Sequence, residues 1–322
     1  MKAIIVRTPG GPNTMVLEDI ELSPPGPDEV RLRHTAIGVN FIDTYHRSGL
    51  YKLPLPTGIG SEGAGVVEVV GENVTRIKIG DRIAYVNVPG SYSEAANIPE
   101  WRAVKLPDSI TDETAAACML KGMTAQYLLK RTFPVQAGQT ILVHAAAGGV
   151  GLILCQWAKH LGVTVIGTVG ADSKRELALA NGCAHVFNSR TEDIPAKVKE
   201  VTGGLGVPVV YDSIGKDTFM ASLNCLQTRG LLVTFGNASG AVPPFEPHLL
   251  SPKGSLYLTR PTLLHYTRNR EEMQETADDL FSMIASGAVK ITVNQRFSLE
   301  KACEAHEALH SRATTGATLL IP

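Results

Sequence analysis

The sequence predicts an α/β protein in which a barrel-like, β-rich domain accompanies a doubly wound parallel sheet. Three observations predict this class. Up to about residue 120, short apolar runs alternate with turns rich in Gly and Pro, and little helical pattern lies between them. From Gln139 onward, continuous apolar runs alternate with helical stretches, as in sheets buried on both faces. The last part of the chain holds more strands than one further sheet position needs, so we assign it back to the first domain.

The β-rich domain takes its expected boundaries from turn-forming residues. Breakers stand at 9–12, 23–27 and 79–81, where Gly and Pro favour turns over strands. Helices are expected later, at 113–120 after the capping residues Ser109 and Thr111, and at about 124–130. The strands expected between the turns are 3–6, 16–22, 30–39, 65–70, 82–86 and 103–106.

The parallel-sheet region and the tail follow in regular alternation. Strands are expected at 140–145, 164–169, 185–187, 207–212, 230–235 and 255–258, with helices at 150–161, 173–181, 194–201 and 216–225. The tail should form a helix at 271–286, a strand at 289–297, a helix at 299–310 and a strand at 317–321. The sequence therefore predicts a catalytic domain at 1–122, a dinucleotide-binding domain at 123–262, and a return to the catalytic domain at 263–322.

The balance of charge and hydropathy excludes several classes of protein. Among 322 residues, 30 Lys and Arg oppose 31 Asp and Glu, which leaves a formal net charge of −1. Such a chain has no strong field to gather nucleic acid or anionic lipid, so neither is an expected partner. No uninterrupted apolar segment reaches the ~18–20 residues of a membrane span. Five Cys, without a Cys-x-x-Cys pair, and a first segment that lacks a signal-peptide core indicate the cytoplasm.

A glycine-rich turn between a strand and a helix is the sharpest motif. In Leu-Val-His-Ala-Ala-Ala-Gly-Gly-Val-Gly, residues 142–151, Ala146, Gly148 and Gly151 fall on the G-x-G-x-x-G spacing, with Ala in the first place. The middle Gly lets a pyrophosphate approach the backbone, and the last lets helix and strand pack closely. The context favours dinucleotide binding over a purely structural turn.

The residues after the next strand bear on the choice of dinucleotide. An acidic residue at that strand end usually selects NAD, whereas this strand ends in Gly-Thr-Val-Gly, followed by Asp172, Ser173, Lys174 and Arg175. Ammonium and guanidinium groups pair with phosphate oxygens, so we expect NADPH. Asp172 argues for NADH, but it lies past the strand end and more naturally caps the next helix. Lys174 as a solvated lysine is the alternative interpretation.

Segments of the first domain complete a wider pattern. Residues 38–45 carry Asn40, Asp43 and Tyr45, and they are followed by Tyr51 and by the glycine-rich segment 58–65. Here the chain resembles the medium-chain dehydrogenase/reductase superfamily, and within it the zinc-independent quinone oxidoreductases related to zeta-crystallin. The resemblance covers nearly the whole chain and rests on 40–45, 60–65, 120–124, 144–151, 211–215, 235–240, 258–261 and 311–322. It implies a GroES-like domain completed by the tail, with the dinucleotide in the cleft beside a Rossmann domain.

The resemblance and the glycine motif together give the expected cofactor residues. Relatives often have a Tyr–Arg pair after the third Rossmann strand, whereas this chain has Asn188, Ser189 and Arg190. Ser189 cannot stack, so we expect looser cofactor binding there. The expected NADPH contacts are Asn40, Lys121, Thr124, Tyr127, Gly148, Gly149, Val150, Gly151, Thr168, Gly170, Ser173, Lys174, Arg190, Ser213, Phe235, Gly236, Thr259 and Arg312.

Two departures from the zinc-containing relatives decide the expected chemistry. Asn40 and Ser61 stand where those alcohol dehydrogenases have a zinc-binding Cys and His, and no Cys precedes residue 118. Amide and hydroxyl groups are poor zinc ligands, so no metal is expected. The nine His form no ligand cluster, and His144 is expected to pack in the sheet.

Without a Lewis acid, the substrate must supply its own electron sink. A quinone does so through a delocalised oxyanion, so the expected function is NADPH-dependent quinone reduction without metal or flavin. An alkenal or enone reductase and a non-enzymatic, crystallin-like nucleotide-binding protein are the alternatives. The expected catalytic residues are Asn40 as an oxyanion donor, Tyr45 or Tyr51 as a stacking or proton-relaying group, and Asp43 as an orienting group. Each is alternatively a satisfied structural group. The strand at 255–258, as a sheet edge, favours a homodimer.

Overall fold

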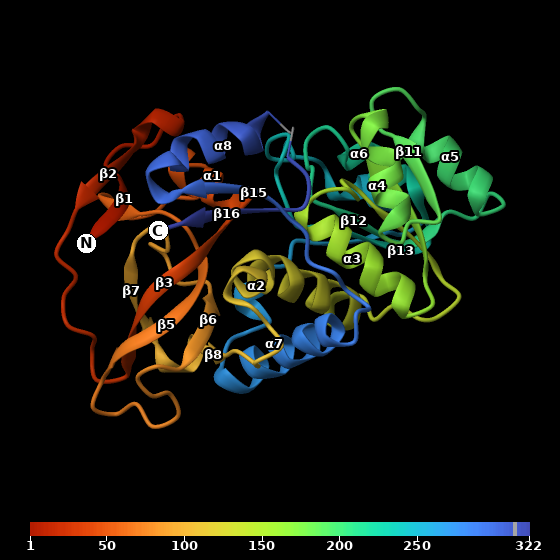
Figure 1. Cartoon of the computed structure of the whole chain (residues 1–322). Coiled ribbons are helices and arrows are strands. Elements are labelled where there is room, and N and C mark those ends of the chain that lie inside the picture. The colour runs from red at the N-terminus through yellow and green to blue at the C-terminus, as the bar shows by residue number, and fades with distance from the viewer. Residues whose placement is uncertain (312–313) are drawn as a thin grey trace. The chain divides into compact units, whose positions relative to one another are not determined.

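The computed structural model describes residues 1–311 and 314–322 and divides into two compact units (Figure 1). Unit 1 comprises Met1–Met123, Thr267–Ala285 and Ile291–Pro322, and unit 2 comprises Thr124–Tyr266 and Ser286–Lys290. The expected domain boundaries at 122/123 and 262/263 lie close to those of the units, at 123/124 and 266/267, and residues 286–290, expected in the first domain, cluster with unit 2. The catalytic and dinucleotide-binding roles given to 1–122, 123–262 and 263–322 stay predictions.

Unit 1 is built on mainly antiparallel sheets. Their strands come from the parts of the chain that precede and follow the main segment of unit 2 in the sequence. In the larger sheet, the strand from the end of the chain lies between its neighbour in the tail and a strand from the start of the chain. This sheet runs β15 (Val293–Ser298), β16 (Ala317–Ile321), β3 (Glu29–Val39), β5 (Glu62–Val70), β6 (Arg82–Val86) and β8 (Val104–Lys105), with β7 (Ala95–Pro99) also paired to β3. The smaller sheet runs β2 (Met15–Asp19), β1 (Lys2–Val6) and β4 (Thr57–Gly58).

Alternation of side chains along β3 explains why this sheet encloses a core. Val30 and Leu32 are fully buried, and they pack with Val67, Ile83 and Ile98 from the neighbouring strands. A period of two places these apolar residues on one face of the sheet. The prediction of a β-rich domain completed by the tail is confirmed.

The helices of unit 1 differ from the expected ones in two places. Residues 41–48, which carry candidate catalytic groups, form α1 (Phe41–Ser48), which the sequence analysis did not identify as a helix. The two helices expected at 113–120 and 124–130 are one helix, α2 (Asp112–Tyr127), followed by a π-helical turn at Leu128–Thr132. Burial of Met119 and Met123 holds the helix through the expected break, because packing overrides local propensity. The tail adds α7 (Arg270–Ala285) and α8 (Ala302–His310).

Unit 2 is a doubly wound parallel sheet. Every pair of neighbouring strands is parallel, and the strand order reverses between β9 and β12. Ile141, Leu142 and Val143 of β9 are almost fully buried, as expected for a strand covered on both faces. The order is β11 (His185–Asn188), β10 (Thr164–Val169), β9 (Thr140–Val143), β12 (Val207–Asp212), β13 (Leu226–Thr234) and β14 (Tyr257–Thr259). The helices are α3 (Gly149–His160), α4 (Arg175–Ala180), α5 (Ile194–Val201) and α6 (Phe219–Cys225).

The parallel-sheet prediction is confirmed, and its errors lie at element ends. The helix expected at 173–181 starts as a 3-10 turn, Asp172–Lys174, before α4. The strand expected at 230–235 begins earlier, at Leu226. In unit 1, the strand expected at 289–297 likewise differs at its end, since it begins later, at Val293. Further 3-10 turns lie at Pro12–Thr14, Glu100–Arg102, Pro247–Leu250, Leu263–His265 and Leu299–Lys301.

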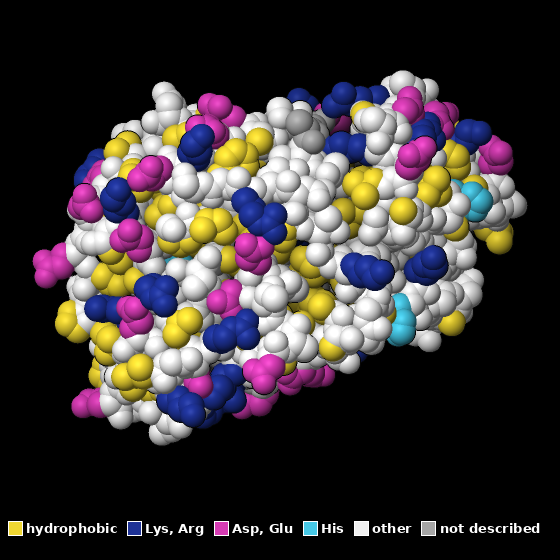
Figure 2. Space-filling model, viewed as in Figure 1, with side chains coloured by type: hydrophobic (Ala, Val, Ile, Leu, Met, Phe, Trp, Pro, Cys, Tyr) yellow, Lys and Arg dark blue, Asp and Glu magenta, His cyan; other side chains and the backbone are white. Residues whose placement is uncertain are grey.

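The distribution of surface charge and the lengths of the helices bear on whether nucleic acid or a membrane is a partner. On the face drawn in Figure 2, Lys and Arg side chains are interspersed with Asp and Glu rather than gathered in a basic stripe. Across the described part of the chain, every helix is too short or too polar to span a membrane.

Candidate functional site

The glycine turn of unit 2 joins β9 to α3. Gly148 is the N-cap of α3, with extended backbone at φ −84° and ψ 173°. A Cβ at Gly151 would lie 2.3 Å from the Ala145 carbonyl oxygen, so this close approach of helix and strand requires glycine. The first-turn N–H groups of a helix lack intrahelical acceptors, and here they follow a turn with small or absent side chains. Gly148, Gly149, Val150 and Gly151 therefore form a backbone surface suited to a pyrophosphate.

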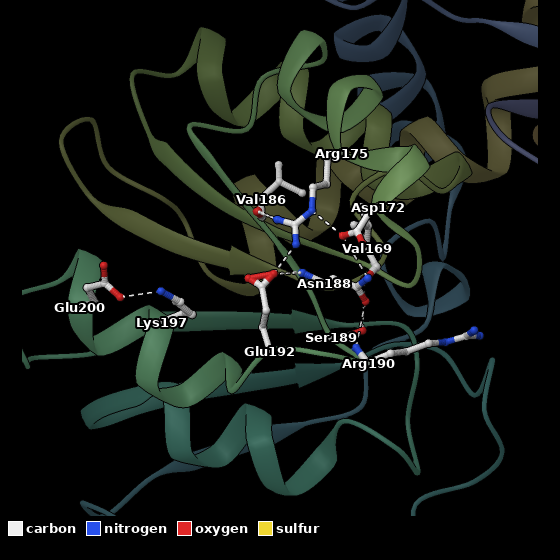
Figure 3. A network of polar contacts seen from close by, with 10 residues as sticks. All are labelled: Val169, Asp172, Arg175, Val186, Asn188, Ser189, Arg190, Glu192, Lys197 and Glu200. Atoms are coloured by element: carbon white, nitrogen blue, oxygen red, sulfur yellow. Dashed lines mark hydrogen bonds and ion pairs between the residues drawn. The ribbon is translucent and has the colours of Figure 1, made fainter.

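Arg175 belongs to the scaffold of the loop after β10, although the sequence suggested it for a phosphate. Figure 3 shows its guanidinium directed at three acceptors: the Asp172 carboxylate at 2.7 Å, the Val186 carbonyl oxygen at 2.6 Å and the Glu192 carboxylate. Hydrogen bonds from Arg175 and then Asn188 hold the pKa of Asp172 below its usual range. Asp172 is not the helix cap that the sequence suggested, because Arg175 and Asn188 occupy its carboxylate.

Lys174 follows β10 and Arg190 follows β11, and the two cations lie close enough to interact. Partial burial, and then the charge of Arg190, lower the pKa of Lys174. The Arg190 Nε lies 3.8 Å from the position that a Cβ of Gly170 would occupy, and its backbone N–H donates to Asn188 Oδ1 at 3.0 Å. Two neighbouring cations repel each other, and a bound dianion would relieve the repulsion. The geometry suits a phosphate group beside Gly170 and Ser173.

His144 lies in a buried chain of hydrogen bonds across the sheet. Its Nδ1 is 2.9 Å from Thr168 Oγ1, and its Nε2 is 3.0 Å from Ser222 Oγ, whose hydroxyl donates to Asp212 at 2.7 Å. Burial lowers the pKa of His144. The neutral ring therefore donates from Nε2 to Ser222 and accepts from Thr168 at Nδ1. His144 packs in the sheet as expected, and the Thr168 hydroxyl, expected to meet the cofactor, faces this histidine instead.

The carboxyl ends of β12, β13 and β14 carry further expected cofactor residues. Ser213 follows β12, Phe235 and Gly236 follow β13, and Thr259 ends β14. The Ala238 N–H donates to the Ser213 carbonyl oxygen at 3.2 Å, so the loops after β12 and β13 touch. These residues gather at the edge where doubly wound sheets bind ligands.

Two more expected cofactor residues lie at the end of α2. Thr124 and Tyr127 are buried, and the Tyr127 ring stacks on Tyr266 with centroids 4.4 Å apart. Arg312 lies outside the described residues.

A buried ion pair supports Asn40 in unit 1. The fully buried Glu62 accepts hydrogen bonds from Asn40 Nδ2 at 2.7 Å, Lys121 Nζ at 3.2 Å and the Leu120 N–H at 2.6 Å. A Cβ at Gly38 would lie 2.2 Å from Glu62 Oε1, so this arrangement requires glycine there. Lys121, expected to touch the cofactor, neutralises Glu62. Glu62 in turn holds the Asn40 amide in one orientation.

Asp43 is the second buried carboxylate of this cluster. It is the third residue of α1, and its Oδ2 accepts from the Asn40 N–H at 2.8 Å and from the Tyr92 hydroxyl at 2.9 Å. Its Oδ1 accepts from Ser61 Oγ at 3.2 Å. Burial raises the pKa of Asp43 to about 7. Asp43 thus brings Asn40 and Ser61, which are distant in sequence, to one carboxylate.

The remaining catalytic candidates, Tyr45 and Tyr51, contact each other. Their rings meet edge to face with centroids 5.2 Å apart, and the Tyr51 N–H donates to the Tyr45 carbonyl oxygen at 3.1 Å.

Sequence reasoning did not assign a role to Glu62, Tyr92 or His306. Glu62 lies in the glycine-rich segment 58–65 and could have been found there, whereas Tyr92 and His306 lie in segments with no motif.

The comparisons with known proteins agree with this geometry. Residues 26–108 match the family model described as "Alcohol dehydrogenase GroES-like domain", and residues 149–283 match "Zinc-binding dehydrogenase". A quinone oxidoreductase of Pseudomonas aeruginosa is 54% identical over 315 residues, which cover 97% of each chain. The chain belongs to the quinone oxidoreductase family of medium-chain dehydrogenases/reductases.

Two further relatives bear on ligands and substrates. The crystal structure of Escherichia coli quinone oxidoreductase complexed with NADPH is 49% identical, covers 100% of each chain and superposes with a TM-score of 0.99. A 2-haloacrylate reductase of Burkholderia is 45% identical over 329 residues, covering 99% of this chain and 98% of its own.

Zinc, named in one family description, does not fit the donor groups of this chain. The Asn40 amide donates to Glu62, and the Ser61 hydroxyl donates to Asp43. Neither position offers the thiolate or imidazole that zinc prefers. In the described ranges, 1–311 and 314–322, no group of three or more His, Cys, Asp or Glu gathers in a way that could hold a metal ion.

Proposed function

We propose that this chain is an NADPH-dependent quinone reductase that passes electrons from the nicotinamide to a small quinone without metal or flavin. The observation that carries the proposal is the full-length likeness to quinone oxidoreductases, one of them solved with NADPH. The paired cations at Lys174 and Arg190 support the choice of NADPH, because NADH has no 2′-phosphate for them to bind.

Most of the proposed cofactor contacts belong to unit 2, whereas Asn40 and Lys121 belong to unit 1. The backbone of 148–151 binds the pyrophosphate, and Gly170, Ser173, Lys174 and Arg190 surround the 2′-phosphate. The remaining proposed contacts are Asn40, Lys121, Thr124, Tyr127, Thr168, Ser213, Phe235, Gly236, Thr259 and Arg312. Thr168 is proposed to contribute through its backbone, since its hydroxyl is paired with His144.

The polar groups of unit 1 serve the acceptor in this proposal. When bound, NADPH supplies the hydride or electrons. Asn40, held by Glu62, donates its second amide N–H to the oxygen on which negative charge develops. Asp43 orients Asn40 and Ser61, and Tyr45 and Tyr51 present aromatic surface to a ring. A quinone needs no Lewis acid, because its product anion is delocalised.

Reduction of an activated C=C bond is the second candidate function. The likeness to 2-haloacrylate reductase favours it, since a conjugated alkene, like a quinone, stabilises the charge it receives. Turnover of 1,4-naphthoquinone compared with a 2-alkenal and with 2-chloroacrylate, under the same conditions, separates the two. A non-enzymatic, crystallin-like role requires that none of these acceptors drives NADPH oxidation.

The test of the proposed function is a steady-state scan of NADPH and NADH against a panel of quinones. We expect quinone-dependent oxidation of NADPH and much weaker oxidation of NADH. Binding of NADPH without oxidation by any quinone in the panel would contradict the proposal.

We further propose a cytoplasmic homodimer that pairs through β14. This short strand stands at the end of the strand order of unit 2, and Tyr257 on it is 60% exposed. An open strand edge invites pairing with a second copy. Sedimentation of micromolar protein as a monomer would contradict the homodimer.

A further inference from the structure

The buried polar groups around Asp43 have fixed directions of donation. Arg47 only donates, so the contact of 3.4 Å between its NH1 and His306 Nδ1 makes Nδ1 the acceptor. Burial, and then the charge of Arg47, lower the pKa of His306 to about 3, so the ring is neutral and its proton is on Nε2. That N–H donates to the Tyr92 oxygen at 3.0 Å, and the Tyr92 hydroxyl donates to Asp43 Oδ2 at 2.9 Å.

This direction decides where a proton binds on Asp43. Oδ2 already receives the Tyr92 hydroxyl and the Asn40 N–H. Oδ1 receives the Ser61 hydroxyl, which can rotate. A proton on the carboxyl group therefore occupies Oδ1 and donates to Ser61 Oγ. The Ser61 hydroxyl then turns its own hydrogen away from Asp43, toward another acceptor.

Of the two hydroxyl groups that contact Asp43, that of Ser61 belongs to the more exposed residue. Ser61 keeps 6% of its surface exposed, whereas Tyr92 keeps 1% and Asp43 is fully buried. We propose that Asp43 and Ser61 form a proton relay that protonates the reduced acceptor, an inference that rests on the proposed function. Ser61 delivers the proton, and Asp43 is its reservoir.

The relay balances the reduction of a quinone. The acceptor gains one hydride from NADPH, that is two electrons and one proton, and becomes a quinol monoanion. The Ser61 O–H bond breaks as its proton passes to the quinol oxygen, and the Asp43 Oδ1–H bond breaks as its proton passes to Ser61 Oγ. Asp43 ends as a carboxylate. Solvent returns one proton through Ser61 after the product leaves, so the net uptake is one proton per NADPH.

Burial of Asp43, modified by the groups around it, makes both protonation states accessible near neutral pH. Burial raises its pKa to about 7, the Glu62 carboxylate on β5 adds to the rise, and the Lys121 ammonium on α2 opposes it. The hydrogen bonds from the Asn40 N–H and from Tyr92 also oppose the rise. Arg47 on α1 and His306 on α8 act on Asp43 through Tyr92. A general acid works best when its pKa is near the working pH.

The first test measures kcat for quinone reduction against pH. Wild-type kcat should fall as the pH rises through about 7, because the Asp43 carboxyl group loses its proton. Ser61→Ala should lower kcat about a hundredfold at neutral pH, reduce the solvent isotope effect and leave NADPH binding unchanged. Ser93→Ala is the matched control, since the Ser93 hydroxyl is likewise buried but donates to the Gly90 and Ala95 carbonyl oxygens.

Tyr92→Phe distinguishes a relay from a merely structural role. It removes a hydrogen bond that lowers the pKa of Asp43, so the fall in kcat should move to higher pH. The same shift should appear in the ¹³C resonance of the Asp43 carboxyl group, assigned with Asp43→Asn, in the absence of any substrate. A variant with lowered kcat but an unmoved pH profile would contradict the relay.

The outcomes separate this inference from the proposed function. If none of the quinones in the panel supports oxidation of NADPH by the wild-type protein, the proposed function is contradicted. Wild-type turnover combined with a Ser61→Ala variant that matches Ser93→Ala at every pH contradicts the relay alone. An Asp43 carboxyl that does not titrate between about pH 5 and 9 also contradicts the relay, whatever the activity.

Discussion

Replacing Lys174 with Ala should weaken NADPH binding far more than NADH binding. The Lys174 ammonium is half-buried and close to the guanidinium of Arg190, and both conditions lower its pKa. In the proposed complex, the 2′-phosphate would offset both the desolvation of Lys174 and its repulsion from Arg190. NADH offers no such group, so removing Lys174 costs it little and even relieves the repulsion on Arg190.

The expected magnitude follows from one charge-assisted contact. Such a hydrogen bond contributes about 1.5–3 kcal/mol, which corresponds to a 10- to 150-fold rise in Kd for NADPH at about 1.4 kcal/mol per tenfold. Arg190 remains after the substitution, so binding of NADPH should be weakened and not abolished. NADH should change by less than about twofold.

Isothermal titration or fluorescence quenching with each nucleotide measures this difference directly. Lys197→Ala is the matched control, because Lys197 is paired with Glu200 on α5, within the region that Figure 3 draws, and contacts no proposed cofactor residue. Equal losses for NADPH and NADH in Lys174→Ala would refute the argument that Lys174 binds the 2′-phosphate.

Four further predictions follow from unit 1. Purified protein should contain far less than one zinc per chain and keep its activity after prolonged chelation; stoichiometric zinc, needed for turnover, would contradict this. Ethanol oxidation and simple ketone reduction should stay near background, and a kcat/KM on either that matches benzoquinone would refute the need for an acceptor that stabilises its own charge. Asn40→Ala should lower kcat by removing an oxyanion donor, whereas Tyr45→Phe and Tyr51→Phe should have modest effects; the reverse ranking in steady-state kinetics would reassign the roles. Burial raises the pKa of Asp43 to about 7, so the native state holds a proton that the unfolded chain releases near pH 4. Wild-type stability should therefore fall relative to Asp43→Asn by about 3 kcal/mol between about pH 5 and 8; urea unfolding that gives a constant difference would contradict the raised pKa.

The fold was largely predictable because its elements follow local rules. The strands of unit 2 are continuous apolar runs, and the glycine turn fixes where β9 gives way to α3. Two short strands, β4 and β7, were missed. β7 reads Ala-Ala-Asn-Ile-Pro and is placed by its pairing with β3, which no local pattern shows.

The sequence singled out candidate site residues, which stay predictions, but it did not show which groups contact them. Asn40, Asp43 and Lys121 were identified from the resemblance, yet their carboxylate and hydroxyl partners come from other strands and helices. Tyr92 and His306 are separated by 214 positions and meet only in the folded unit. Arg175 shows the converse: its charge suggested a phosphate, and the Asp172 and Glu192 carboxylates bind it instead.

The position of β16 constrains the order in which the chain folds during synthesis. Thr318, Leu319 and Leu320 pair with Val39, Gly38 and Ile37, so the end of β3 has no partner there until residues about 280 positions later emerge from the ribosome. The continuous segment Thr124–Tyr266, the bulk of unit 2, is complete well before that point. Unit 2 therefore has time to fold while the end of β3, which leads into Asn40, still lacks its hydrogen-bonding partner β16. A pause in translation between the codons for residues 266 and 317 would prolong the exposure of that edge, and with it the risk of aggregation.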